Sequence, residues 1–288
     1  MKAFLIPILL VICFFPLNTS GECIEGDCVN GEGIAAFPDG TEYEGKFKEY
    51  SFDEGTLRFP DGNEYVGQFL NRRFHGQGTY TYSEGTYKGQ FVYNTFHGKG
   101  VLTFSDGREY EGLFRGGEFH GKGRLTYPDG TTCEGDWVDG QFSGKGTLTY
   151  PNGVKYSGPI ENNMLDGQGV LIFPDGKEYR GQFKDSKFHG QGILSYPDGR
   201  IYSGEFEDSK FQGQGTLVYP DGGIYVGQWK DGKFNGEGSF TFSDSTKYEG
   251  HFENNVFSGQ GVVTYSDGRT LPGEFEKGKF NPPPQKII

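Results

Sequence analysis

The sequence predicts an all-β protein: an elongated single-sheet solenoid of antiparallel β-hairpins with an aromatic-lined groove. Three observations predict it: a frame that recurs every 22 or 23 residues, glycine at 50 of 288 positions, and aromatic residues at 16% of positions. A period of about 20 to 50 residues is typical of repeat architectures, in which each unit packs only against its neighbours. Leu, Ile and Val are too few to fill a large rounded core, so we expect a thin sheet.

The first residues differ from everything after them. Lys2 precedes an apolar run over 3–17, and small polar residues follow at 18–21. This order is typical of a secretory signal peptide, and the run is short for a transmembrane helix. We therefore expect the mature chain to be exported, to the periplasm, the cell surface or the medium; an uncleaved anchor is the alternative. Lipid attachment at Cys13 is disfavoured, because Ile12 is not the small residue that lipidation signals need.

The repeat then sets the remaining boundaries. The expected organisation is a signal peptide over 1–21, an N-terminal cap with a cysteine pair over 22–33, the repeat array over 34–281, and a C-terminal tail over 282–288. No stretch between the repeats is long enough to form a second domain.

Two cysteines stand at the start of the mature chain. Fully extended, the step from Cys23 to Cys28 would span about 16 Å, whereas the Cα atoms of a disulfide lie about 5.5 Å apart. Gly26 permits the turn that brings them together. Export favours a Cys23–Cys28 disulfide over two reduced thiols. Cys133 lies about five repeats away, so we expect it to be a buried free thiol.

Each repeat carries three motifs: Tyr-x-Gly-x-Phe, then Phe-x-Gly-x-Gly, then Pro-Asp-Gly. The first motif begins at Tyr43, Tyr65, Tyr87, Tyr110, Cys133, Tyr156, Tyr179, Tyr202, Tyr225, Tyr248 and Leu271. We interpret each unit as two short strands, with Pro-Asp-Gly forming a type I turn that ends in a left-handed residue. Ser245 replaces the turn glycine once, and we expect that turn to be looser, because a left-handed serine is strained.

The two-residue period of a strand sorts the side chains onto two faces. Phe96 and Leu102 share one face with the glycines between them, whereas His97 and Lys99 point the other way. One face is therefore aromatic rings interleaved with glycine, and the other is mostly polar. Glycine lets the sheet curl, so we expect an open gutter lined with aromatic rings.

The aromatic face is the candidate binding surface. Its rings pack on one another as the core of a thin sheet, yet one layer cannot cover all of them, and an exposed aromatic stripe is typical of a partner site. Trp137 and Trp229 replace phenylalanine and offer large amphipathic contact areas. The candidate contacts are Tyr110, Phe114, Phe119, Trp137, Tyr179, Phe183, Tyr225 and Trp229.

Charge and spacing disfavour several other functions. A net charge of −12 argues against nucleic acid and anionic lipid as partners. Four histidines, at 75, 97, 120 and 189, each follow a phenylalanine. Equivalent positions in neighbouring repeats lie about 9–10 Å apart, whereas a metal needs donors at about 2.0–2.1 Å. No nucleophile has a base partner, so we expect no catalytic, metal or cofactor site.

These motifs resemble the MORN (membrane occupation and recognition nexus) repeat, in register over roughly residues 30–280. The resemblance implies a rod of β-hairpins that serves as a scaffold, an interaction surface or a dimerisation module. The chain is similar to repeat segments of plant phosphatidylinositol-phosphate kinases and of a lysine methyltransferase, but it has no room for either catalytic domain. We expect a non-enzymatic scaffold or interaction protein of the cell envelope or exterior that binds a protein partner or forms a homodimer. A module that binds a glycan or a lipid headgroup is the alternative.

Overall fold

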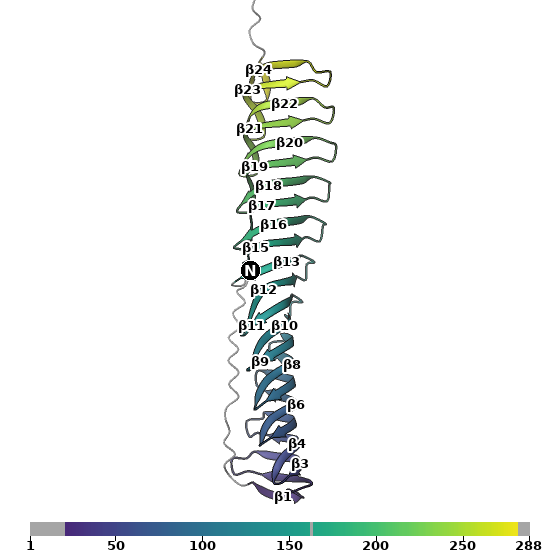
Figure 1. The fold of residues 1–288 in the computed structure, drawn as a ribbon, viewed down its shortest axis with the longest axis vertical. Helices are drawn as coiled ribbons and strands as arrows, with labels where there is room; N and C mark the ends of the chain where they lie inside the picture. Colours follow the sequence, from purple (N-terminus) through teal and green to yellow (C-terminus); the bar gives the residue numbers. More distant parts are fainter. Residues whose placement is uncertain (1–20, 162–163, 282–288) are drawn as a thin grey trace, which may run out of the picture. The chain divides into compact units, whose positions relative to one another are not determined.

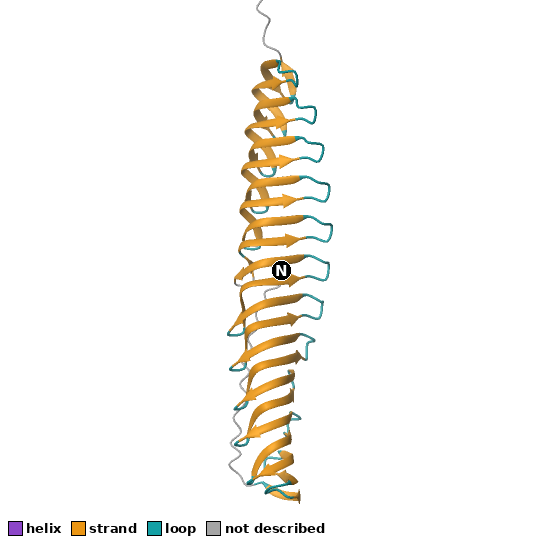
Figure 2. Ribbon diagram, turned by 45° about the vertical axis from the view of Figure 1, so that its right-hand side comes forward, coloured by secondary structure: helices purple, strands orange, loops and turns teal. Residues whose placement is uncertain are grey.

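The computed structural model describes residues 21–161 and 164–281, so residues 1–20 of the expected signal peptide and the expected tail lie outside the described residues. The described residues contain strands and turns but no helix (Figure 2). None of them therefore forms a helix with the length and apolar character needed to span a membrane. The prediction of an all-β protein built from antiparallel hairpins is confirmed. The chain divides into two compact units, which meet in sequence at Pro151 and Asn152.

Unit 1 contains strands β1 to β12, each antiparallel to the next along the chain (Figure 1). Their bounds are β1 Glu22–Gly26, β2 Glu32–Ala36, β3 Glu42–Lys48, β4 Ser51–Arg58, β5 Glu64–Leu70, β6 Arg73–Tyr82, β7 Gly85–Val92, β8 Thr95–Phe104, β9 Glu109–Arg115, β10 Glu118–Thr126, β11 Thr132–Val138 and β12 Gln141–Thr149. Because every partner is a sequence neighbour, unit 1 is a linear row of hairpins, as the repeat predicts.

Unit 2 contains strands β13 to β25, and β13 pairs with both β14 and β15. Their bounds are β13 Lys155–Glu161, β14 Met164–Leu165, β15 Gly167–Ile172, β16 Glu178–Lys184, β17 Lys187–Ser195, β18 Ile201–Glu207, β19 Lys210–Val218, β20 Ile224–Lys230, β21 Lys233–Thr241, β22 Lys247–Glu253, β23 Val256–Thr264, β24 Thr270–Glu276 and β25 Lys279–Asn281. From β15 onward each strand again pairs with the next.

The Pro-Asp-Gly turns have the predicted geometry. Gly130 is left-handed, with φ of 86°, and its N–H donates to the carbonyl of Tyr127 at 2.9 Å. The turn aspartate, Asp129, accepts the N–H of Thr131 at 2.8 Å, which fixes the exit from the turn. Ser245 takes the same left-handed conformation, with φ of 67°, and its N–H donates to the carbonyl of Phe242 at 3.0 Å, so this turn keeps the hydrogen bond of the glycine turns although the sequence predicts a looser one.

A second turn, present in every repeat for which the structure describes these residues, was not identified from the sequence. At the opposite end of the hairpin, two successive residues are left-handed, as at Asp208 and Ser209 with φ of 49° and 65°. Two left-handed residues are typical of the type I′ turn that matches strand twist. The Ser209 N–H donates to the carbonyl of Phe188 at 3.0 Å, and the Phe188 N–H donates to Ser209 Oγ at 3.1 Å. These bonds tie each turn to the preceding repeat.

Paired glycines allow the rings to lie against the backbone. Gly89 faces Gly100 across β7 and β8, and the register then shifts by two residues, because Gln90 faces His97. A Cβ atom added at Gly100 would lie 2.5 Å from the Tyr87 ring. Only glycine therefore lets the ring approach this closely.

The core of each unit is a ladder of aromatic rings on the inner face. Tyr87 stacks on Phe96 with ring centroids 3.8 Å apart. It also makes edge contacts with Phe91 at 5.1 Å and with Phe114 of the next repeat at 4.9 Å. The same pattern recurs in unit 2, where Tyr179 stacks on Phe188 with ring centroids 3.8 Å apart. Within each unit, ring contacts thus link successive repeats and supply the core that aliphatic residues do not.

Candidate functional site

The eight predicted contact residues lie in the core. Their exposed fractions are 0% for Tyr110, Phe119, Tyr179 and Tyr225, 3% for Phe114, Trp137 and Phe183, and 5% for Trp229. Each tyrosine is covered by the rings of its own hairpin and of the next repeat, so the gutter expected to be open is filled by its own side chains. These eight side chains therefore leave little exposed surface for a partner to contact.

The polar atoms of these rings are used inside the sheet. The Tyr87 hydroxyl lies 2.9 and 3.2 Å from the carbonyl oxygens of Gln90 and His97, where the register shift leaves them outside the regular ladder. The indole N–H groups of Trp137 and Trp229 donate to backbone carbonyls at 3.1 and 3.2 Å. Burial raises the pKa of the Tyr179 phenol to about 12. These groups therefore satisfy the backbone and offer nothing to a ligand.

Sequence reasoning missed a glutamine that supports the register shift. Gln68 Oε1 accepts the N–H of Gln77 at 3.0 Å, and Gln228 Oε1 accepts the N–H of Glu237 at 3.1 Å. Glu205 Oε1 accepts the N–H of Gln214 at 3.0 Å in the same way. The sequence signal for this contact is the glutamine that directly follows the glycine of the Tyr-x-Gly motif, because the pattern Tyr-x-Gly-Gln recurs along the chain.

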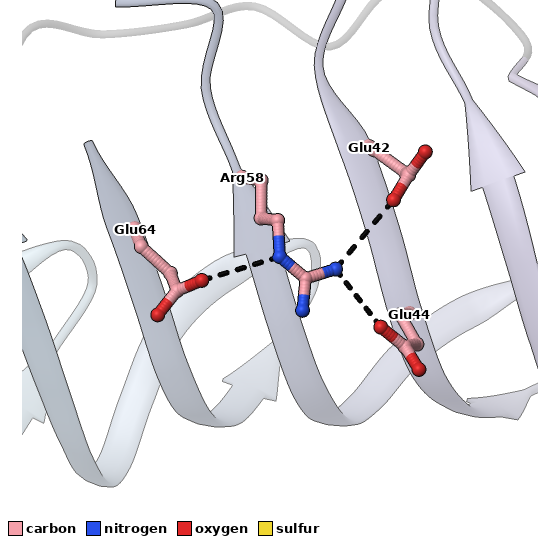
Figure 3. A network of polar contacts seen from close by, with 4 residues as sticks. All are labelled: Glu42, Glu44, Arg58 and Glu64. Carbon is pink, nitrogen blue, oxygen red and sulfur yellow. Dashed lines mark hydrogen bonds and ion pairs between the residues drawn. The ribbon is translucent and has the colours of Figure 1, made fainter. Parts of the chain in front are cut away.

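The outer face of unit 1 is charged. We consider the two outward positions that flank the first residue of the Tyr-x-Gly-x-Phe motif, which is Cys133 in β11, or that flank the residue paired with it on the next strand, which from β4 to β21 is a leucine, tyrosine or phenylalanine. There the guanidinium of Arg58, on β4, lies between carboxylates of the two neighbouring strands (Figure 3). Its nitrogens lie 2.9 Å and 3.5 Å from carboxylate oxygens of Glu44 and Glu42 on β3, and 3.2 Å from one of Glu64 on β5. The same positions hold Lys88, Glu109, Glu111, Arg124 and Glu134. Among the described strands β3 to β12, two successive strands never lack charge at these positions.

The same positions of unit 2 are different. Five successive strands, β17 to β21, carry no charge there. We call these ten residues the β17–β21 patch: Ile193, Ser195, Ile201, Ser203, Thr216, Val218, Ile224, Val226, Ser239 and Thr241. Four apolar members are at least 36% exposed, namely Ile193 (44%), Ile201 (44%), Ile224 (36%) and Val226 (49%). Neighbouring apolar side chains exposed on one face are typical of an interaction surface.

Opposite charges bound the patch on both sides. On β16, Arg180 pairs with Glu178 of the same strand, and on β22 Lys247 lies 2.7 Å from Glu249. The first row of the patch therefore runs from Glu178 to Lys247, and the second from Arg180 to Glu249. An uncharged centre with a charged rim is the usual anatomy of a protein interface.

A second set of rings is only partly buried. In unit 2 the aromatic residue before each closing turn is intermediate or exposed, and these residues are Phe173, Tyr196, Tyr219, Phe242 and Tyr265. Some carry a cation over the ring, as Arg200 does over Tyr196 at 4.6 Å. Asp198 binds that guanidinium at 2.8 Å, and the backbone N–H and side chain of Arg200 lower the pKa of the carboxyl.

The cysteines lie where the sequence placed them. Cys23 and Cys28 form a disulfide with Cα atoms 5.9 Å apart. Cys133 is a buried free thiol, and burial raises its pKa to about 12. At neutral pH it is therefore protonated and a weak nucleophile. Among the described residues, no group of three or more His, Cys, Asp or Glu side chains is placed to hold a metal ion.

A family model described as the MORN repeat matches nine segments: 65–86, 87–107, 110–132, 133–155, 156–178, 179–199, 202–224, 225–247 and 248–268. The repeats that begin at Tyr43 and Leu271 lie outside these segments. A search of curated proteins gave no match.

Solved structures that this chain resembles include TCP domains. The SAS-4 (dCPAP) TCP domain of Drosophila melanogaster, in complex with a proline-rich motif of Ana2, is 13% identical with a TM-score of 0.33 and aligns over 62% of this chain and 85% of that one. The TCP10 domain of Danio rerio CPAP, in complex with a peptide of STIL, is 14% identical with a TM-score of 0.31 and aligns over 84% and 98%.

Proposed function

The chain belongs to the MORN repeat family, and from this premise we propose that it is a non-enzymatic interaction protein that binds a protein partner or a second copy of itself. The observation that carries the proposal is the β17–β21 patch, in which four apolar side chains are exposed among positions that carry no charge on five successive strands. Removing such surface from water contributes about 25 cal/mol per Å². The aromatic rings are already buried in the core, so the outer face takes the role that the sequence assigned to them.

The contrast between the units supports this choice of surface. The equivalent positions of unit 1 hold the Arg58 network and further charges, which keep that face soluble. An exposed edge or face without such charges invites association. The patch in unit 2 is therefore the part of the outer face best suited to a partner.

The test is capture followed by direct measurement. The chain without residues 1–20 is immobilised, proteins that it retains from an extract of the source organism are identified, and each is then purified and titrated against the chain. Under the proposal, at least one purified protein or the chain itself binds, and Val226→Glu weakens that binding more than Val66→Glu. Absence of binding to any protein, the chain included, overturns the proposal.

We also propose that the protein acts outside the cytoplasm. The proposal rests on the basic, apolar and small-polar order of residues 1–21 and is compatible with the Cys23–Cys28 disulfide. N-terminal sequencing of protein from the envelope or the medium is expected to begin near Gly21 or Glu22. A mature chain that keeps Met1, or one found only in the cytosol, contradicts it.

One observation favours a second candidate, glycan binding. The half-buried rings before the closing turns recur once per repeat, and two strands separate them by about 9–10 Å. Sugars stack on such rings. A glycan array would show binding that is lost with Tyr265→Ala, a 38% exposed ring that follows β23 and lies outside the β17–β21 patch. Liposome flotation covers the lipid-headgroup alternative, which the net charge of −12 disfavours for anionic lipid.

A further inference from the structure

We propose that the β17–β21 patch binds the same patch of a second copy of the chain, face to face, about a two-fold axis that runs along β19. This inference rests on the proposed interaction function and names its partner. It follows from the arrangement of the patch, because a two-fold interface needs a surface that is complementary to itself.

The apolar side chains of the first row are symmetric about β19. Val218 of β19 faces Ile201 of β18 on one side and Ile224 of β20 on the other. Beyond them the row continues with Ser195 and Thr241, both uncharged and small. A two-fold axis along β19 therefore sets Val218 against Val218, and Ile201 against Ile224 of the second copy.

The charges of the rim obey the same symmetry. β16 and β22 both lie three strands from β19. The axis sets Glu178 opposite Lys247 of the second copy, and Arg180 opposite Glu249 of the second copy. All four charges then meet an opposite charge, and the contact occurs on both sides of the axis. Electrostatic complementarity of this kind selects the partner and its register.

An axis across the strands fits the patch less well. It also pairs opposite charges at the rim, because Glu178 then meets Arg180 of the second copy. However, it sets Val218 against Thr216 and Ile201 against Ser203, so Ile224, which then meets Val226, is the one residue of the first row that keeps an apolar partner. Charge alone therefore permits two orientations, and the apolar row selects the axis along β19.

The size of the patch predicts a weak dimer. The patch and its charged rim on β16 and β22 cover seven strands, which span about 29 Å at about 4.8 Å spacing, and four residues along a strand span about 14 Å, which gives about 400 Å² per copy. Stable interfaces bury about 800 Å² per partner. We therefore expect dissociation constants in the range of about 10–100 µM, so self-association has to be measured at high concentration.

The test uses sedimentation equilibrium of the chain without residues 1–20, at protein concentrations that bracket this range. Val226→Glu places a carboxylate in the middle of the patch in each copy, and we expect it to weaken dimerisation about tenfold or more. Val66→Glu is the matched control, because both valines stand in the sequence Tyr-Val-Gly-Gln and are similarly exposed, at 49% and 45%. The control is expected to dimerise as the wild type does. Circular dichroism confirms that both variants keep their strands.

Exchanging charges within a pair tests the axis. Glu178→Lys with Arg180→Glu keeps the pair on β16 but sets like charges opposite β22 of the second copy, so dimerisation is lost. Adding Lys247→Glu with Glu249→Lys restores it. If the axis ran across the strands, the first exchange would leave dimerisation unchanged.

Three results overturn the inference: a wild type that stays monomeric at all concentrations, equal effects of Val226→Glu and Val66→Glu, or no effect of the first charge exchange. The proposed function fails separately, only if no purified protein binds either. A monomeric chain that binds another protein through the patch would reject the second copy as partner and leave the interaction function in place.

Discussion

The repeats that begin at Tyr87 and at Cys133, both in unit 1, have the same backbone register and differ in the side chains that pack on it. In the first, Gly89 faces Gly100 and the register then shifts by two residues. In the second, the corresponding glycines face each other and the same two-residue shift follows. The path of the chain is therefore kept where the tyrosine is absent, which shows that glycine pairs and turns set it.

The rings respond to the missing tyrosine. Tyr87 is 0% exposed and stacks on Phe96 at 3.8 Å. In the Cys133 repeat, Phe142 lies over the glycine pair instead, since a Cβ atom added at Gly146 would lie 2.1 Å from its Cζ atom. Phe142 is only partly buried, whereas Phe96 is 1% exposed. Tyrosine thus adds packing and a hydroxyl to a frame that forms without it.

The largest expected effect comes from giving the Tyr87 repeat the cysteine that stands at the same position in the Cys133 repeat. Tyr87→Cys removes the stacked ring and the hydroxyl that serves the carbonyls of Gln90 and His97. We expect a loss of about 3 kcal/mol in the free energy of unfolding, as for large-to-small core substitutions. Urea denaturation measures it, and amide exchange of β7 and β8 locates it. A loss below about 1 kcal/mol would mean that Phe96 can refill the site, as Phe142 does.

The next largest effect is expected from replacing one glycine of the pair by alanine, and the loss of stability is expected to differ between the two repeats. Gly100→Ala drives a Cβ atom into Tyr87, which is fully buried, so we expect a loss of about 2–3 kcal/mol from overpacking. Gly146→Ala meets Phe142, whose ring is partly exposed and can swing outward, although the Cβ atom also lies 2.7 Å from the carbonyl oxygen of Glu134, so we expect a smaller loss of about 1–2 kcal/mol. Thermal unfolding of the two variants compares them directly. Equal losses would refute the difference in ring mobility.

The sequence predicted the hairpins, the Pro-Asp-Gly turns, the cysteine pair and the face on which the rings lie. It did not reveal the register shift, because a shift by two residues leaves the alternation of side chains unchanged. The type I′ turns have varied residues, such as Asp208-Ser209, that show no single motif. Whether rings on one face are covered depends on curl, which the pattern does not specify. The β17–β21 patch needed cross-strand registers before its residues could be seen as neighbours.

The smallest expected effect concerns the hydroxyl alone. Tyr87→Phe keeps the stack but loses the hydrogen bond, so we expect a loss of about 1 kcal/mol at pH 8. Burial raises the pKa of the Tyr87 phenol, whereas the unfolded chain ionises near pH 10. Unfolding therefore releases a proton above pH 10, and stability falls as pH rises toward the folded pKa. The variant lacks this ionisable hydroxyl, so its free energy of unfolding falls less steeply with pH between 10 and 11 than that of the wild type. Parallel curves would contradict the buried phenol.

The central claim is that the aromatic face is a closed core and that partners meet the outer face. The chain has two tryptophans, Trp137 and Trp229, both among the predicted groove residues and 3% and 5% exposed. Iodide quenching of their fluorescence tests the claim most directly, with urea-unfolded protein as reference. We expect the native tryptophans to be quenched several-fold less than the unfolded ones. Native quenching equal to that of the unfolded chain would show an open aromatic groove and contradict the account.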